Sequence, residues 1–261
     1  MRLVILLVIY WISPFTYAAE RCHQLQVSGT VEYPPFMWQS QQSKQSMDGA
    51  LIELMSYLSA QSHIQLQVNY TGAWARTQAE MKIGSLDALA GIFYNEERAR
   101  TMVFLEPPVA QSNARIWVKK GKNTSISSLE QLDKLQGATV IGFSLGQTFD
   151  EYAASHHNIA RVRSIKQAFQ MLDAGRIDFV AYEEQPGIAI LNIMEIVPEH
   201  LEMLPYLISS EDVYLALAKN SPCNTAEVKQ QLQELLVKAK ESNVIDAMLE
   251  RAQQRWVESN Q

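Results

Sequence analysis

Apolar and polar positions along the first third of the chain predict strands and helices in alternation. Apolar residues recur at helical spacing after Asp48-Gly49, and other stretches show the period of two, or the short apolar run, that is typical of strands. The expected elements are strands at 24–27, 65–70 and 87–93 and helices at 49–58 and 74–83. This order is typical of a mostly parallel sheet flanked by helices.

A second unit with the same alternation follows. The expected elements are strands at 116–118, 138–143, 177–182 and 213–218 and helices starting at 127 and over 148–154, 165–172, 225–242 and 244–256. Two α/β units with a late return strand predict two lobes that the chain crosses more than once, with a binding cleft between them. We expect lobe I over 20–109 and 211–261, lobe II over 110–210, and the hinge near Ala110 and Ser210.

The first 19 residues have the pattern of a secretory signal peptide. A positive charge at Arg2 precedes an apolar run over 3–12, and small residues lead up to Ala18-Ala19. The apolar run is about half the length of a membrane span. We expect cleavage after Ala18 or Ala19 and an exported protein.

Charge and cysteine content narrow the choice of partners. The formal charge of −6 becomes −7 when Arg2 is removed with the signal peptide. This negative charge argues against nucleic acid or an anionic membrane as the partner but not against a small anionic ligand.

Cys22 and Cys223 would be exported to an oxidising compartment, which favours a disulfide between them. Two unpaired thiols or a two-residue metal site are the alternatives.

The segment from Asp87 to Arg98 contains the first candidate for ligand chemistry. It begins as a buried strand and ends, after a polar turn at Asn95, with an arginine. Ligands of open α/β sheets bind beyond the carboxyl ends of the strands, and a guanidinium suits a carboxylate. The alternative is a solvated arginine at a helix start, paired with Glu96 or Glu97.

Several short motifs then occur in an order that resembles a known family. They are Tyr33-Pro34-Pro35-Phe36, Trp74, Glu97-Arg98, 104–108, 127–132, 140–142, Gly146-Gln147-Thr148, 175–178 and 214–219. In this order, and over nearly the whole mature chain, they resemble the type II periplasmic solute-binding proteins that serve amino-acid ABC importers. The resemblance implies an α/β fold of two lobes, each a mostly parallel sheet flanked by helices, joined by a two-strand hinge.

The resemblance also implies roles for individual residues. Arg98 would grip the α-carboxylate of the ligand. Gly146, Gln147 and Thr148 would add carboxylate contacts, which agrees with the free N–H groups at a helix N-terminus. The aromatic residues Tyr33 and Trp74 would sandwich the ligand side chain, and Phe36 belongs to the same aromatic motif as Tyr33.

Two departures from the family pattern leave the ligand class open. Glu183 stands where amino-acid binders usually carry an aspartate for the α-ammonium group, and Glu184 is an alternative for that role. Gly91 and Phe93 lie where family members often have hydroxyl residues. The resemblance implies a periplasmic monomer that needs no cofactor or metal, binds an amino acid or related carboxylate, and has an ABC permease as its partner.

Two enzymatic readings compete with the binding one. Residues 142–146 match the G-x-S-x-G pattern with Ser144 as nucleophile, and Asp178 and His200 follow in hydrolase order, although a glycine-flanked ligand loop explains the same residues. The solute-binding fold also resembles that of periplasmic cyclohexadienyl dehydratases. There, Glu183 or Glu184 would act as a general acid in a dry cleft.

Overall fold

The computed structural model describes residues 22–40, 43, 46–121, 125–194 and 200–260. The expected signal peptide lies outside these residues. Within them, no helix combines the length and apolar character that a membrane crossing requires.

The structure is a mixed α/β fold. Its strands are β1 (Gln24–Ser28), β2 (Glu32–Tyr33), β3 (Met37–Gln39), β4 (Met47–Asp48), β5 (Gln65–Val68), β6 (Ala88–Phe93), β7 (Met102–Lys119), β8 (Gly137–Val140), β9 (Ile159–Val162), β10 (Phe179–Glu183) and β11 (Leu201–Ala218). Its helices are α1 (Ala50–Gln61), α2 (Trp74–Lys82), α3 (Glu96–Ala99), α4 (Gln147–Ser155), α5 (Ile165–Asp173), α6 (Glu184–Leu191), α7 (Ala226–Glu241) and α8 (Val244–Ser259), with a 3-10 helix at Leu129–Leu132.

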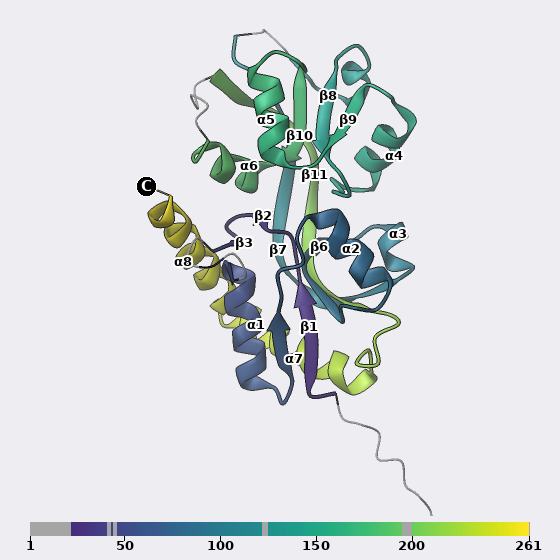
Figure 1. Cartoon of the computed structure of the whole chain (residues 1–261), viewed down its shortest axis with the longest axis vertical. Helices are drawn as coiled ribbons and strands as arrows, with labels where there is room; N and C mark the ends of the chain where they lie inside the picture. Colours follow the sequence, from purple (N-terminus) through teal and green to yellow (C-terminus); the bar gives the residue numbers. More distant parts are fainter. Residues whose placement is uncertain (1–21, 41–42, 44–45, 122–124, 195–199, 261) are drawn as a thin grey trace, which may run out of the picture.

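A large sheet connects the two ends of the molecule. Eight strands lie in the order β5-β1-β6-β11-β7-β10-β8-β9, and β2, β3 and β4 form a small separate sheet. The outer pairs are parallel, whereas β7 and β11 pair antiparallel with each other. These two strands have 18 residues each and run from the lower into the upper part of the molecule (Figure 1).

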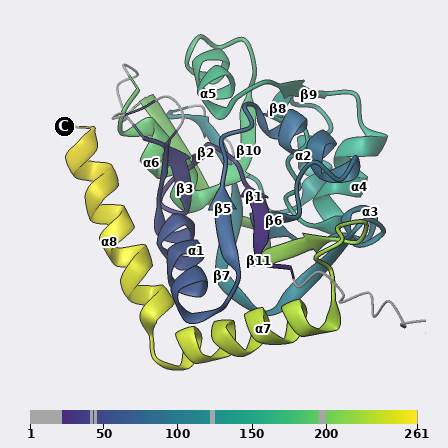
Figure 2. The same ribbon diagram turned by 60° about the horizontal axis from the view of Figure 1, so that its bottom comes forward.

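Helices cover the sheet in two groups. The lower half contains β1, β5 and β6 with α1, α2, α3, α7 and α8, and the upper half contains β8, β9 and β10 with α4, α5 and α6 (Figure 1). In the lower half α1 and α8 lie side by side and α7 crosses below the sheet (Figure 2). Arg251 and Arg255 of α8 hold α1 and its start through ion pairs with Glu53 and Asp48.

The structure confirms the expected α/β fold class, but several elements differ from those predicted. β7 was expected only over 116–118 and β11 only over 213–218, and β9 and α6 were not expected. The expected helix start at 127 leads into the short 3-10 helix. β7 was underestimated because it contains Pro107, Pro108 and Arg115, and such residues weaken a strand pattern.

A disulfide joins Cys22 to Cys223, as expected from the two cysteines. Their Cα atoms lie 5.4 Å apart although 201 positions separate them in sequence. Cys22 precedes β1, and Cys223 lies in the loop before α7. The bond therefore ties the first strand of the sheet to the C-terminal helices.

Candidate functional site

A chain of cavities lies between the lower and upper halves. The central cavity has a volume of about 20 Å³ and lies between a chamber of about 430 Å³ and a second chamber of about 500 Å³. The lower half lines the central cavity with Thr30, Tyr33, Trp74, Gly91, Phe93 and Arg98. The upper half contributes Phe143, Ser144 and Glu183. Six of the ten predicted ligand residues therefore meet at one place.

Arg98 is positioned by the turn that follows β6. Asn95 caps α3, since its side-chain oxygen accepts a hydrogen bond from the backbone N–H of Arg98 at 2.8 Å. This short helix turns the arginine back toward the strand end. Its Nη1 donates to the carbonyl of Phe93 at 2.8 Å, and its Nη2 donates to the carbonyl of Gly142 at 3.2 Å.

The Arg98 side chain is not a solvated surface group. The residue is 8 % exposed, and its guanidinium lies 6.0 Å from the ring centre of Trp74. Burial lowers the pKa of Arg98 to about 10, against the opposing effect of the Asp150 and Glu183 carboxylates. Arg98 therefore keeps its charge at neutral pH. The alternative of an exposed arginine at a helix start is wrong.

Glu183 ends β10 and faces the central cavity. It is 2 % exposed, and its Oε2 accepts hydrogen bonds from the hydroxyls of Tyr33 at 2.6 Å and Ser112 at 2.5 Å. Burial raises the pKa of Glu183 to about 7, although these two donors and Arg98 act in the opposite direction. Glu184 instead pairs with Arg115 at 2.7 Å, outside the central cavity.

The carbonyl of Gly142 joins the two halves. It accepts hydrogen bonds from Trp74 Nε1 at 2.9 Å, Gln78 Nε2 at 3.0 Å and Arg98 Nη2 at 3.2 Å. All three donors belong to the lower half, and the acceptor belongs to the loop after β8 in the upper half. The structure is therefore a closed arrangement of the two halves.

Aromatic rings surround the central cavity. Phe143 of the upper half meets Trp74 of the lower half with ring centres 6.3 Å apart, and its other neighbour is Tyr182 at 5.5 Å. Tyr33 stacks on Phe36 at 4.7 Å. Phe36 does not line the central cavity; its contact with the site is the stack on the Tyr33 ring.

Gly91 shapes the floor of the cavity. Ile92 pairs with Tyr214 and Ala90 with Leu215, so Gly91 is an extra residue in β6. Its φ of 82° is in the left-handed region, and a Cβ there would lie 2.6 Å from a methyl carbon of Leu51. Glycine at this position lets the Tyr33 ring approach the strand.

The predicted contacts at the start of α4 are not brought to the central cavity. Gln147 and Thr148 are exposed, and Gln147 bonds to Glu151. Gly146 is buried against Glu211, which lies where a Cβ would be. The carboxylate of Asp150 accepts hydrogen bonds from the Ser144 hydroxyl and the Leu145 N–H, and thus takes donors of this loop that a ligand carboxylate would need.

Sequence reasoning missed residues that complete the site. Ser112 lies within the long strand β7, and Thr30 follows β1 in a segment without a recognisable pattern. Gly142 belongs to the 142–146 pattern, but that pattern does not show that its backbone carbonyl accepts hydrogen bonds from the lower half. Asp150 could have been noticed as an acidic residue in the first turn of a helix, where carboxylates are favoured.

The residues of the hydrolase alternative do not form a triad. Ser144 bonds to Asp150, and His200 Nδ1 lies 3.1 Å from an oxygen of Asp173. Asp178 accepts a hydrogen bond from the backbone N–H of Gln136 at 3.0 Å. The serine therefore has no histidine base among these residues.

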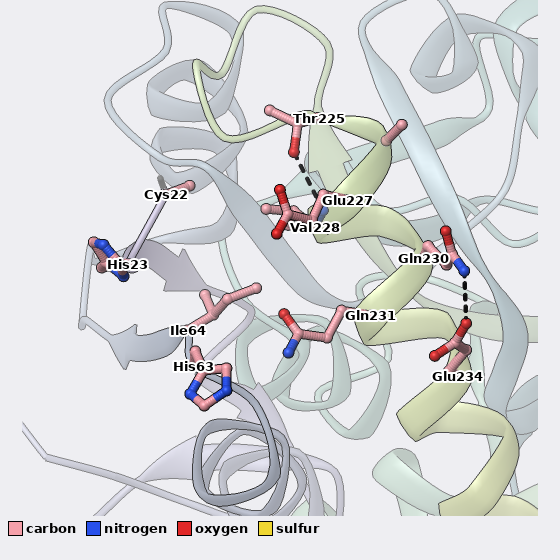
Figure 3. Close-up of a pocket in the computed structure, with 11 residues that line it drawn as sticks. Cys22, His23, His63, Ile64, Thr225, Glu227, Val228, Gln230, Gln231 and Glu234 are labelled. Carbon is pink, nitrogen blue, oxygen red and sulfur yellow. Dashed lines mark hydrogen bonds between the residues drawn. The ribbon is translucent and has the colours of Figure 1, made fainter. Parts of the chain in front are cut away.

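A larger cavity of about 1050 Å³, drawn in Figure 3, shares no lining residue with this site. Cys22, His23, His63 and Ile64 line one side of it, and the start of α7 lines the other. In the described part of the chain no three histidine, cysteine or acidic side chains are grouped to hold a metal ion. The cavity contains neither a buried guanidinium nor a buried carboxylate, so size alone does not make it the functional site.

Comparison with known proteins places this architecture in a family. Residues 25–258 match the bacterial extracellular solute-binding proteins, family 3. A search of curated proteins finds no match. Three similar crystal structures are a P235GK mutant of ArgBP from T. maritima, a histidine kinase sensor domain with similarity to periplasmic binding proteins, and AbpA from Streptococcus pneumoniae bound to L-arginine.

These structures share the fold at low sequence identity. The ArgBP mutant is 19 % identical, with 88 % of this chain and 94 % of that chain covered and a TM-score of 0.73. The sensor domain is 22 % identical, covers 90 % and 96 %, and has a TM-score of 0.76. AbpA is 18 % identical, covers 92 % and 97 %, and has a TM-score of 0.74.

The fold and the cleft define a two-lobe solute-binding architecture of type II. The chain belongs to the bacterial extracellular solute-binding proteins, family 3.

Proposed function

We propose that this chain is a periplasmic solute-binding protein that captures an amino acid or a related carboxylate between its two halves for ABC-type import. In this proposal the halves are lobe I (20–109 and 211–261) and lobe II (110–210). β7 and β11 form the hinge, and the protein acts as a monomer. Family membership and the neighbouring amino-acid-binding structures support the proposal.

The opposed charges of Arg98 and Glu183 are the observation that carries it. A buried guanidinium on the lower half and a buried carboxyl on the upper half line the same cavity. A zwitterion presents a carboxylate and an ammonium group, which complement these two side chains. Closure removes water, and the attraction between each pair of charges then becomes stronger.

The ligand needs room that only an opening of the halves provides. Its carboxylate would replace the Gly142 and Phe93 carbonyls as acceptors for Arg98, and its ammonium group would contact Glu183. Tyr33 and Trp74 would then face the ligand side chain, and Gly91 and Phe93 would form an apolar floor. The groups that now hold the halves together are thus the groups that a ligand would use.

A binding screen tests the proposal directly. Amino acids and matched 2-hydroxy acids are titrated into the mature protein and followed by thermal unfolding and calorimetry. A ligand present at about one hundred times its Kd adds about 2.7 kcal/mol to the free energy of unfolding. Saturable binding of an amino acid that is recovered unchanged supports the proposal, and absence of binding by every amino acid and hydroxy acid contradicts it.

The pH dependence of affinity tests the role of Glu183. An ammonium ligand needs the ionised carboxylate, and the pKa of Glu183 is about 7. The affinity for an amino acid should therefore rise about tenfold from pH 6 to pH 8, while the affinity for the matched 2-hydroxy acid should not rise. A rise of equal size for both ligands would show that the ammonium group does not contact Glu183.

A dehydratase-like activity is the second candidate. The raised pKa of Glu183 suits a general acid at neutral pH, because its proton is available in a dry cavity. Incubation with prephenate and analysis of the products tests this function. Turnover that Glu183→Gln abolishes would favour the enzyme, and recovery of unchanged prephenate would leave the binding function alone.

A further inference from the structure

A second compartment opens from the central cavity. This aromatic chamber, of about 430 Å³, shares Thr30, Trp74 and Phe143 with the central cavity. Its volume is typical of a ligand pocket, whereas the central cavity is at most the size of one water molecule. A group attached to a carboxylate at Arg98 can therefore extend past Trp74 and Phe143 into the chamber.

The walls of the chamber are flat and firmly held. Trp38 and Trp256 pack edge to face with ring centres 5.3 Å apart, and Trp256 Nε1 donates to the carbonyl of Ala189 at 3.0 Å. Trp74 is fixed by its bond to Gly142. Tyr70 completes this wall of rings. Tyr70 and Phe143 are less buried than these tryptophans, so their rings are the ones that a planar apolar group can contact. Aromatic pairs gain contact energy beyond their buried area.

The charged residues of the chamber leave an excess of positive charge. Glu32 is half-buried, and burial raises its pKa, while Lys166 and the backbone N–H of Ile165 stabilise its ionised form. Its carboxylate therefore already has partners. Arg163 also lines the chamber, and no described carboxylate forms an ion pair with it. Arg163 is exposed at the start of α5, so its guanidinium is available to a ligand.

A cationic side chain suits this chamber less well. Arg163 lines the chamber and would repel a second positive charge.

We infer that the aromatic chamber binds the side chain of the ligand, and that this side chain is bulky and planar and carries an anionic group at its far end. The inference rests on the proposed function, because Arg98 must hold the other end of the same ligand. Arg163 selects the anionic end. The rings around Trp74 and Phe143 select the planar part.

Calorimetry with four probes tests this specificity. The mature protein is titrated with alanine, arginine, phenylalanine and 4-carboxyphenylalanine. We expect 4-carboxyphenylalanine to bind most tightly, with phenylalanine second. Arg163→Gln should weaken 4-carboxyphenylalanine about fivefold, as expected for loss of one ion pair at a rim, and leave phenylalanine unchanged.

Arg176→Gln is the matched control. Arg176 is exposed and follows the other end of α5, so this variant loses the same charge away from the chamber. Equal weakening by both variants would overturn the role of Arg163. Tightest binding of alanine, arginine or phenylalanine would overturn the inferred ligand class but leave the proposed function intact. Absence of binding by all four probes and by the wider screen would overturn both.

Discussion

Replacing Glu183 by glutamine should remove a pH-dependent penalty on folding. The Glu183 carboxyl is fully enclosed, and Tyr33 and Ser112 both donate to the same oxygen. Glutamine has nearly the same shape and retains an oxygen that can accept from both hydroxyls. The variant therefore changes little except that the side chain no longer ionises.

The size of the effect follows from the shift of the pKa. The pKa of Glu183 is raised from 4.5 to about 7 in the folded protein. Because the folded state prefers the protonated form, its stability falls as pH rises from the unfolded-state pKa to the folded-state pKa. One pKa unit corresponds to about 1.4 kcal/mol, so the full loss is about 3 kcal/mol and is complete above about pH 8.

Urea denaturation of both proteins over a pH series measures this loss. The difference in free energy of unfolding between wild type and Glu183→Gln cancels contributions from groups that both proteins share. Relative to the variant, wild type should lose about 3 kcal/mol between about pH 4 and pH 8. Glu258→Gln removes the same charge at an exposed position of α8, where no described residue forms an ion pair with it, and controls for net charge. A wild-type difference that is flat with pH would refute the reasoning.

Two further substitutions test the site and the scaffold. Arg98→Ala should weaken binding of any carboxylate ligand at least about thirtyfold, because the buried carboxylate of the ligand is left unpaired. The control Arg100→Ala changes an exposed neighbour and should leave the affinity unchanged. Calorimetric Kd values within threefold of each other for the two variants would contradict the assignment. The double variant Cys22→Ser/Cys223→Ser opens a loop of about 200 residues and should lose about 3–5 kcal/mol in urea denaturation without a change in Kd. A loss below about 1 kcal/mol would show that the disulfide contributes little to folding.

The part of the site that depends on local sequence patterns can be predicted from the sequence. β6 has an uninterrupted apolar run, and Asn95 three residues before Arg98 forms a helix cap that sequence alone suggests. Arg98 thus follows from local rules. The disulfide followed from the cysteine count and the expected compartment.

The rest depends on contacts between distant segments. Glu183 and Glu184 are adjacent in sequence, and only their tertiary contacts show that Glu183 faces the cavity while Glu184 pairs with Arg115. Gly146 to Thr148 look like a carboxylate site, but Asp150 turns back and takes the donors of the loop. These outcomes arise from tertiary packing, for which the sequence has no periodic signal.

The long pairing of β7 with β11 also brings the two ends of the upper segment together. Val213 is the register partner of Ala110, so the chain leaves and re-enters the lower half at adjacent positions. Neighbouring strands lie about 5 Å apart, a gap that a tight turn bridges. The upper part, which supplies Glu183, is therefore one continuous stretch of chain, whereas the lower part, which supplies Arg98, is assembled from the stretches before and after it.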